Sequence, residues 1–171
     1  MKIIDLTQVL DDKMEVYPGD PEVSIKQVHF LDKEGWNLRY LCFSSHIGTH
    51  VNAPIHMVDR GKTLDDLTLD LFYGEATKDI ITTGNGVIYT KQNIDLKTAE
   101  KLVKAKVKFV GLSAQFEFDI SVEKYLLSNG IISFENLINT EDLPPKFIFC
   151  GFPLKIKNGD GSPVRAVAVI N

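Results

Sequence analysis

Apolar and polar residues alternate with a period of two over several short stretches of the chain, a pattern typical of half-buried β-strands. Many of these stretches are rich in β-branched and aromatic residues, which favour strands. A proline-rich turn at the start of one stretch, "EVYPGDP", leads into its strand. The pattern predicts strands within 1–7, 15–31, 38–51, 74–83, 86–90, 107–113, 131–134, 146–150 and 164–170.

Two segments carry a helical pattern instead. "DLKTAEKLVKAK" is amphipathic, and Asp95 stands where an N-cap is expected. "SVEKYLLSNG" predicts a second helix, with Ser121 placed to cap it and Gly130 to end it. Gly84, Asn85 and Gly86 favour a turn that joins the strands on either side. The order of elements predicts a mixed α/β domain built on a curved sheet or barrel, with few helices between strands.

Composition narrows the classes of partner. The 171 residues suit one domain, 1–171, and the formal net charge of −4 argues against a nucleic-acid partner. No apolar run approaches the ~20 residues of a membrane span. The N-terminus turns acidic too early for a signal peptide. Cys42 and Cys150, far apart in apolar surroundings, are interpreted as buried free thiols, which indicates a cytoplasmic protein.

The segment "SSHIGTHVNAPIHM" gathers most of the candidate chemistry. Three of the four histidines, His46, His50 and His56, fall within it. Because side chains on a strand alternate, His46, Gly48, His50 and Asn52 would point to the same side. Pro54 then turns the chain, so that His56 can approach the same point from a loop. A set of separate histidines bonded to the backbone is the alternative, but their clustering favours a site.

Two imidazoles and an amide oxygen suit a divalent ion of intermediate softness, zinc or manganese. Such an ion lowers the pKa of its bound water toward ~7 and polarises a substrate carbonyl. His56, with an ordinary pKa near ~6.5, would then transfer the proton. The residues therefore outline a metal-dependent hydrolase.

The same segment resembles a known signature. "HIGTHVNAPIH" is similar to the H-x-G-T-H-x-D-x-P-x-H motif of the cyclase-like metal hydrolases, a family that includes bacterial kynurenine formamidase, and differs from it only at Asn52. The segments "IDLTQVLDDKMEVYPGDP", "IISFENL" and "GDGSPVRAVAVI" also resemble family segments. The resemblance implies a swivelling β/β/α fold, hydrolysis of the C–N bond of a small N-formyl or cyclic amide, and a homodimer or homotetramer.

Residue roles follow from the resemblance by position. It implies that His46, His50, residue 52 and Glu135 bind the metal and that His56 is the catalytic acid/base. Tyr17 falls where formamidases place an aromatic residue against the substrate. The plainer alternatives are a strand-end cap for Glu135 and loop packing for Tyr17. The remaining polar residues of the C-terminal segment are interpreted as turn and surface residues: Asp160, Ser162 and Arg165.

Two departures from the family pattern concern the metal. Position 52 is usually Asp, which can bridge two ions, and two-metal members carry a further histidine near the position of Glu123. Here residue 52 is Asn, and no histidine follows His56. We therefore expect one ion per subunit, held by His46, His50 and Glu135 with Asn52 as a weak fourth ligand. Glu123 as a replacement ligand is a further possibility.

Two functions remain open at this level. The first is a metal-dependent hydrolase that acts on a small amide or cyclic amide through a metal-activated water. The second is a degenerate family member that binds a metal or small ligand without turnover, which the two departures favour.

Overall fold

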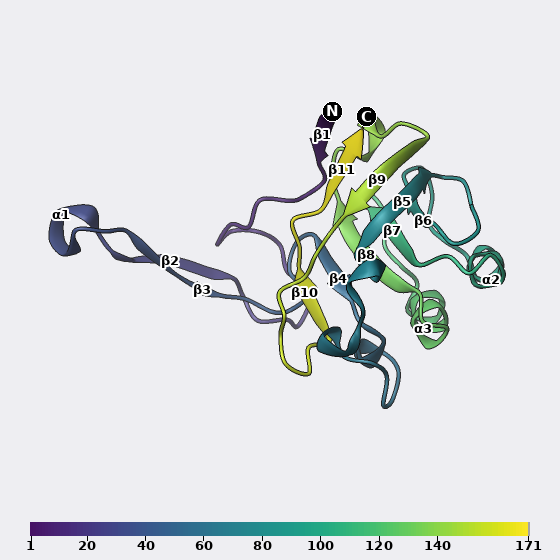
Figure 1. Ribbon diagram of the computed structural model, residues 1–171. Helices are drawn as coiled ribbons and strands as arrows, with labels where there is room; N and C mark the ends of the chain where they lie inside the picture. The colour runs from purple at the N-terminus through teal and green to yellow at the C-terminus, as the bar shows by residue number, and fades with distance from the viewer. Residues whose placement is uncertain (171) are drawn as a thin grey trace.

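The chain folds around one nine-stranded mixed sheet that curves into a half-barrel (Figure 1). The computed structural model describes residues 1–170. The predicted α/β class with a curved sheet and few helices is confirmed. Across the sheet the strands are β1 (Lys2–Asp5), β11 (Val167–Ile170), β9 (Lys146–Cys150), β5 (Tyr73–Lys78), β6 (Gly86–Tyr89), β7 (Phe109–Ser113), β8 (Ile132–Leu137), β4 (His50–Asn52) and β10 (Gly161–Pro163).

The centre of the sheet is parallel and covered on both faces. Strands β5, β6, β7 and β8 run parallel to one another, and their outer neighbours are antiparallel. Helix α2 (Leu96–Lys104) connects β6 to β7, and α3 (Ile120–Ser128) connects β7 to β8. Along β7, Val110 belongs to the core beneath these helices, whereas Phe109 packs with Phe134 and Phe149 on the opposite face. Burial on both faces explains the nearly continuous apolar sequence of this strand.

The two predicted helices form, but one cap differs from the prediction. The Asp95 side chain accepts a hydrogen bond from the backbone N–H of Thr98, as an N-cap should. At α3 the cap is Asp119, not Ser121, and the backbone N–H of Ser121 donates to it. Asp119 caps the helix in preference to Ser121 because a helix N-terminus favours a negative charge. Gly130 follows the helix with a positive φ of 75°, consistent with its predicted role as the stop.

The predicted turn at Gly84–Gly86 lies between β5 and β6, but the two strands do not form a hairpin. These strands pair in parallel, with Ala76 opposite Gly86, and residues 79–85 carry the chain back along the sheet. Gly86 cannot carry a side chain here, because a Cβ would lie 2.0 Å from the ring of Phe109. The glycine therefore serves close packing against a core aromatic residue instead of a tight turn.

A separate two-stranded hairpin projects from the body of the fold (Figure 1). It consists of β2 (Ser24–His29) and β3 (Leu38–Cys42), with the short helix α1 (Leu31–Glu34) at its tip. All residues of β3, including Cys42, are exposed, so the predicted burial of Cys42 is wrong. Both cysteines are free thiols, as predicted. None of the helices within residues 1–170 is long and apolar enough to cross a membrane. The remaining short elements are 3₁₀ turns at Pro54–His56, Leu64–Asp66, Leu69–Leu71 and Thr140–Asp142.

Candidate active site

Strand β4 supplies the base of the candidate site. It lies between β8 and β10, and its register places His50 opposite Glu135 and Asn52 opposite Ser133. Cross-strand partners in an antiparallel pair have adjacent side chains. The sheet therefore brings His50, Asn52 and Glu135 together, and the predicted common direction of residues 50 and 52 follows from the strand period.

His46 reaches the site by a different route from the one its spacing predicts. The predicted strand breaks after Cys42, and Gly48 adopts a left-handed conformation with φ +57°. His46 therefore lies on a turn and not on the same strand face as His50. The positive φ favours glycine at position 48, and the space is tight as well, because a Cβ there would lie 3.1 Å from Leu10 Cδ2 and 3.2 Å from Met14 Cε.

The His50 ring is oriented by the same turn. Its Nδ1–H donates to the Gly48 carbonyl oxygen at 2.8 Å, and the Asn136 amide also donates to that oxygen, at 3.1 Å. The other ring nitrogen, Nε2, consequently faces Glu135 Oε1 at 3.4 Å. Burial alone would lower the pKa of His50, but the hydrogen bond and charge of Glu135 raise it overall. A backbone carbonyl that fixes one nitrogen so that the other is free is the usual support of a metal-ligating histidine.

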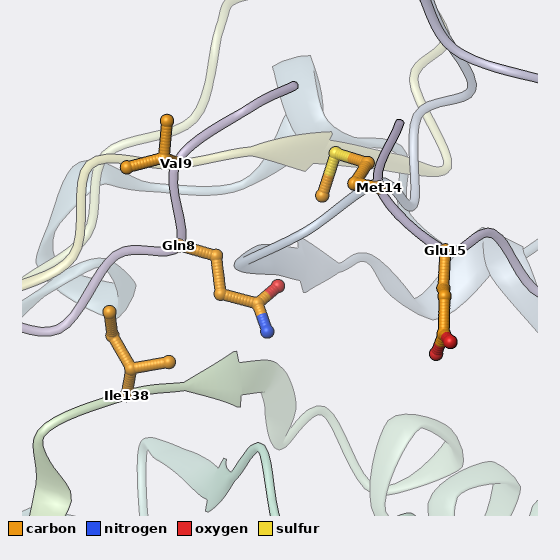
Figure 2. Close-up of a pocket in the computed structure, with 5 residues that line it drawn as sticks. All are labelled: Gln8, Val9, Met14, Glu15 and Ile138. Carbon is orange, nitrogen blue, oxygen red and sulfur yellow. The ribbon is translucent and has the colours of Figure 1, made fainter. Parts of the chain in front are cut away.

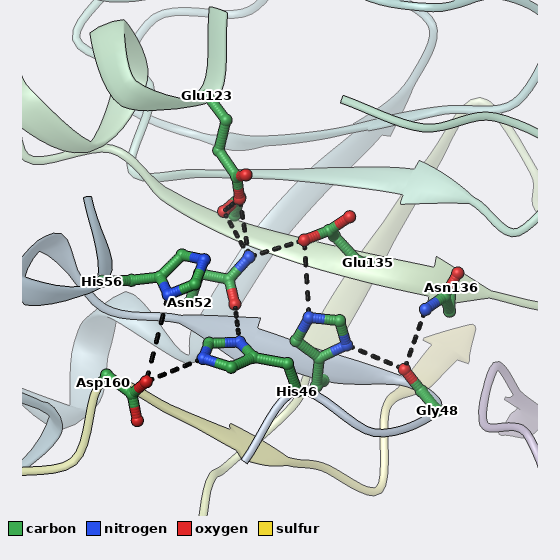
Figure 3. Close-up of polar contacts among 10 residues, drawn as sticks. His46, Gly48, Asn52, His56, Glu123, Glu135, Asn136 and Asp160 are labelled. Carbon is green, nitrogen blue, oxygen red and sulfur yellow. Dashed lines mark hydrogen bonds and ion pairs between the residues drawn. The ribbon is translucent and has the colours of Figure 1, made fainter. Parts of the chain in front are cut away.

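The Asn52 side chain, fully buried, connects the two halves of the site (Figure 3). Its Oδ1 lies 2.7 Å from His46 Nδ1. Its Nδ2 donates to one carboxylate oxygen of Glu123 and one of Glu135, each at 2.6 Å. Asn52 is thus positioned by a histidine on one side and by two carboxylates on the other.

Glu123 enters the site from α3 and is 4% exposed. Its Oε1 also accepts a hydrogen bond from the Ser133 hydroxyl. Burial and the nearby charge of Glu135 raise the pKa of Glu123 to about 7. For Glu135 burial acts in the same direction, but the hydrogen bond from His50 lowers its pKa overall. Two neighbouring carboxyl groups therefore differ in their tendency to ionise, with Glu135 the charged member.

Asp160 completes the opposite side of the site, where the sequence had suggested a surface residue. Its Oδ2 lies 2.9 Å from His46 Nε2 and 3.9 Å from His56 Nδ1 (Figure 3). Its Oδ1 accepts a hydrogen bond from the Ser45 hydroxyl at 3.0 Å. Burial would raise its pKa, but the hydrogen bonds from His46 and Ser45 lower it, so that the carboxylate is ionised. Asp160 does lie at a bend with its side chain 48% exposed, as interpreted, but its carboxylate also belongs to the histidine cluster.

His56 lies at the end of the 3₁₀ turn that Pro54 begins, and its ring centroid is 4.1 Å from that of His46. Burial and the charge of His46 lower the pKa of His56. His56 is therefore neutral near pH 7 and able to accept a proton. His56 thus approaches His46 from the turn at Pro54, as predicted.

Tyr17 is the one predicted site residue that the structure leaves outside this cluster. It is 70% exposed, and none of the polar contacts within residues 1–170 joins it to the histidines. Its role in substrate binding stays a prediction. An open surface hollow, which shares Gln8 and Met14 with the surroundings of Gly48, has a volume of about 410 Å³ (Figure 2). It is lined by Gln8, Val9, Met14, Glu15 and Ile138.

The residues fit one divalent ion. Both ring nitrogens of His46 face oxygen atoms, yet a neutral imidazole has a single N–H, so one contact needs a proton or a cation. Within residues 1–170, the ligand atoms of His46, His56 and Asp160 all lie within 4.8 Å of one another. The predicted set is more open: His50 Nε2 faces Glu135 Oε1 at 3.4 Å, and the ring centroids of His46 and His50 are 5.3 Å apart. Histidine nitrogens with a carboxylate oxygen are typical ligands of zinc and manganese.

Two residues of the site escaped sequence reasoning. Ser133 lies within a predicted strand, where its hydroxyl gave no signal. Asp160 stands between two glycines in "GDG" just before a short strand, a flexible setting that reads as a turn. Only pairing of β10 with β4, which places Gly161 opposite Asn52, brings Asp160 to the histidines.

The fold and the site define the class: an α/β half-barrel with a partly buried cluster of histidines and carboxylates around β4. The comparisons with known proteins name the family. The model of the cyclase family matches residues 4–110, and the kynurenine formamidase of Salinibacter ruber is 30% identical over 205 aligned positions, covering 98% of this chain and 97% of the relative. The chain belongs to the cyclase family.

Solved structures agree on the fold. Isatin hydrolase A from Ralstonia solanacearum superposes with a TM-score of 0.84 at 18% identity, covering 99% of this chain and 92% of that protein. A "predicted metal-dependent hydrolase" from Bacillus stearothermophilus gives a TM-score of 0.78 at 21% identity, with 98% and 97% covered. The kynurenine formamidase relative is a hydrolase, so the chain lies within a family that includes hydrolytic enzymes.

Proposed function

We propose that the protein is a metal-dependent hydrolase that cleaves the C–N bond of a small amide or cyclic amide. One observation carries the proposal: Nε2 of His50, fixed by the Gly48 carbonyl, faces Glu135 beside the rings of His46 and His56. The names of the relatives support the bond type, because kynurenine formamidase and isatin hydrolase both act on amides.

The proposed ligands are His46, His50 and Glu135, with one zinc or manganese ion per chain. When bound, the ion would acidify a water molecule and polarise the substrate carbonyl. Glu135 is the carboxylate suited to bind the ion, because its lowered pKa keeps it charged. Gly48 holds the His50 ring in the required orientation through its carbonyl oxygen.

His56 is the proposed acid/base. In its neutral form it accepts a proton from the water that attacks the amide carbon, and it returns this proton to the nitrogen as the C–N bond breaks. The products are a carboxylic acid and an amine, or one ring-opened amino acid from a cyclic amide. Asp160, at 3.9 Å from His56 Nδ1, stabilises the protonated ring between these two transfers.

A second candidate function is a non-catalytic member that binds a metal or small ligand. The presence of Asn52 between the two carboxylates favours it, because an amide supplies no charge to an ion. The two functions predict different behaviour of the purified protein.

The deciding experiment measures the metal content of the purified protein and then hydrolysis of a panel of N-formyl and cyclic amides with added zinc or manganese. The hydrolase proposal predicts about one ion per chain and turnover of at least one substrate class. A protein that binds one ion and remains inactive on the whole panel supports the binding function. A protein that is metal-free and inactive with every ion contradicts the proposed hydrolase.

A further inference from the structure

Two carboxylates of the site, that of the buried Glu123 and that of the half-buried Glu135, meet at one nitrogen atom. Glu123 Oε1 and Glu135 Oε1 each lie 2.6 Å from Asn52 Nδ2, and Asn52 and Glu123 are almost completely buried. Two carboxylates so close in a buried setting repel each other and require a positive partner or strong donors. Within residues 1–170, the ion pairs of Lys and Arg lie elsewhere, at Asp5, Asp59 and Asp70.

The amide of Asn52 supplies the missing donors. Its NH₂ group carries two hydrogens, and one is available for each carboxylate. Ser133 adds its hydroxyl to Glu123, and His50 Nε2 faces Glu135. The position between the two carboxylates is therefore filled by a neutral group of this chain.

The hydrogen bonds of this amide oppose the reverse orientation. With Oδ1 of Asn52 turned toward the two glutamates, the ionised Glu135 would face a second acceptor, and both 2.6 Å hydrogen bonds from Nδ2 would be lost. Oδ1 can therefore face an ion shared with Glu135 only if both short hydrogen bonds are lost. Asn52 would therefore lose two hydrogen bonds on binding an ion, unlike the other predicted ligands.

We propose that Asn52 is not a metal ligand but takes the place of a cation between Glu123 and Glu135, so that the site accepts a single ion. The number of ions rests on the proposed function, whereas the role of Asn52 as the donor between two carboxylates does not. The inference replaces the expectation, drawn from the sequence, that Asn52 is a weak fourth ligand. Asn52 is here a positioning residue for Glu135.

The experiment combines ion stoichiometry with metal-free stability. Wild type and Asn52→Asp are stripped with a chelator, their thermal midpoints are measured, and each is then saturated with Mn²⁺ for elemental analysis. We expect one ion per wild-type chain and two per Asn52→Asp chain. In the metal-free state three carboxylates would meet in the variant, and its midpoint should fall by roughly 10 °C and recover with Mn²⁺.

Two further variants control for the change of charge. Asn85→Asp makes the same substitution at a half-buried asparagine far from the site, whose amide donates to the exposed Glu75 at 3.2 Å, and its metal-free midpoint should change little. The double variant Asn52→Asp/Glu123→Gln restores the number of carboxylates, and should recover metal-free folding even if Asn52→Asp alone does not fold.

The outcomes separate the two proposals. Two ions bound to wild type, a metal-free loss in Asn52→Asp no larger than in Asn85→Asp, or a double variant that is not rescued would each overturn the role of Asn52. A wild type that binds no ion and hydrolyses no amide contradicts the proposed function instead. Even then, the metal-free midpoints decide whether Asn52 holds the carboxylates together.

Discussion

Asp160 Oδ2 lies 2.9 Å from Nε2 of His46, although 114 positions separate the two residues in the chain. The same carboxylate lies 3.9 Å from His56 and accepts a hydrogen bond from Ser45. Asp160, which directly precedes β10, thus contacts two histidines that flank β4. Asp160 is therefore placed to control both the orientation of His46 and the charge of His56.

Asp160→Asn should lower kcat/KM by roughly 10- to 100-fold, the usual effect of removing a group that orients a ligand. The charge of Asp160 raises the pKa of His56, so its removal should also move the acidic limb of the pH–rate profile to lower pH. Ion content should stay at about one per chain. Loss of the ion would show instead that Asp160 is a ligand. Asp59→Asn, at an exposed carboxylate, is the matched control.

His56→Ala should reduce kcat by roughly 10²- to 10⁴-fold, the range for loss of a general acid/base, while the ion remains bound. Steady-state kinetics and elemental analysis of the same preparation test this pair of outcomes. His29→Ala is the control, because His29 lies in the projecting hairpin and packs against Trp36. If the ion is lost together with activity, His56 belongs to the set of His46, His56 and Asp160 that holds it.

Glu123→Gln should stabilise the metal-free protein at alkaline pH. The folded chain keeps a proton on Glu123 up to a pH of about 7, because burial and Glu135 raise its pKa from 4.5 to about 7. The unfolded chain releases that proton near the ordinary value, so this group favours folding at low pH and loses its contribution as pH rises through the window. Glutamine keeps the shape and remains neutral.

The difference in thermal midpoint between Glu123→Gln and wild type should therefore be small near pH ~5 and largest at about pH 8. Scanning calorimetry in the presence of a chelator measures it. The matched control is Glu100→Gln, at an exposed position of α2, which should show no such trend. A difference independent of pH would mean that Glu123 is ionised in the folded protein throughout this range.

Gly48→Ala should lower the free energy of unfolding by about 2 kcal/mol, because it adds a Cβ both to a left-handed residue and to a crowded position. Gly84 has a similar φ of +76° but open space around it, so Gly84→Ala should cost only about 1 kcal/mol. Denaturant titrations separate the two. Equal losses would mean that Leu10 and Met14 move aside without cost. Weaker ion binding by Gly48→Ala alone would confirm its link to His50.

Local patterns in the sequence were sufficient for much of the fold. Asp95 caps its helix as predicted, because an N-cap depends only on groups three residues away. The common direction of His50 and Asn52 follows from the strand period. Their meeting with Glu135 needed the family resemblance, because a strand pattern does not say which strands pair. The turn at Gly84–Gly86 has the same property: a turn signal does not say whether the strands on either side pair antiparallel, as in a hairpin, or in parallel.

The sequence by itself determined the α/β class, the histidine cluster and its resemblance to the cyclase family, because these depend on periodicity and on a contiguous motif. Only the tertiary structure decided that Asp160 enters the site, that His46 arrives from a turn at Gly48, and that the Asn52 amide faces Glu123 and Glu135. These contacts join β4 to α3, β8 and the segment before β10, and the closing of the sheet sets them. Because long-range register is a property of the whole sheet, no local stretch encodes it.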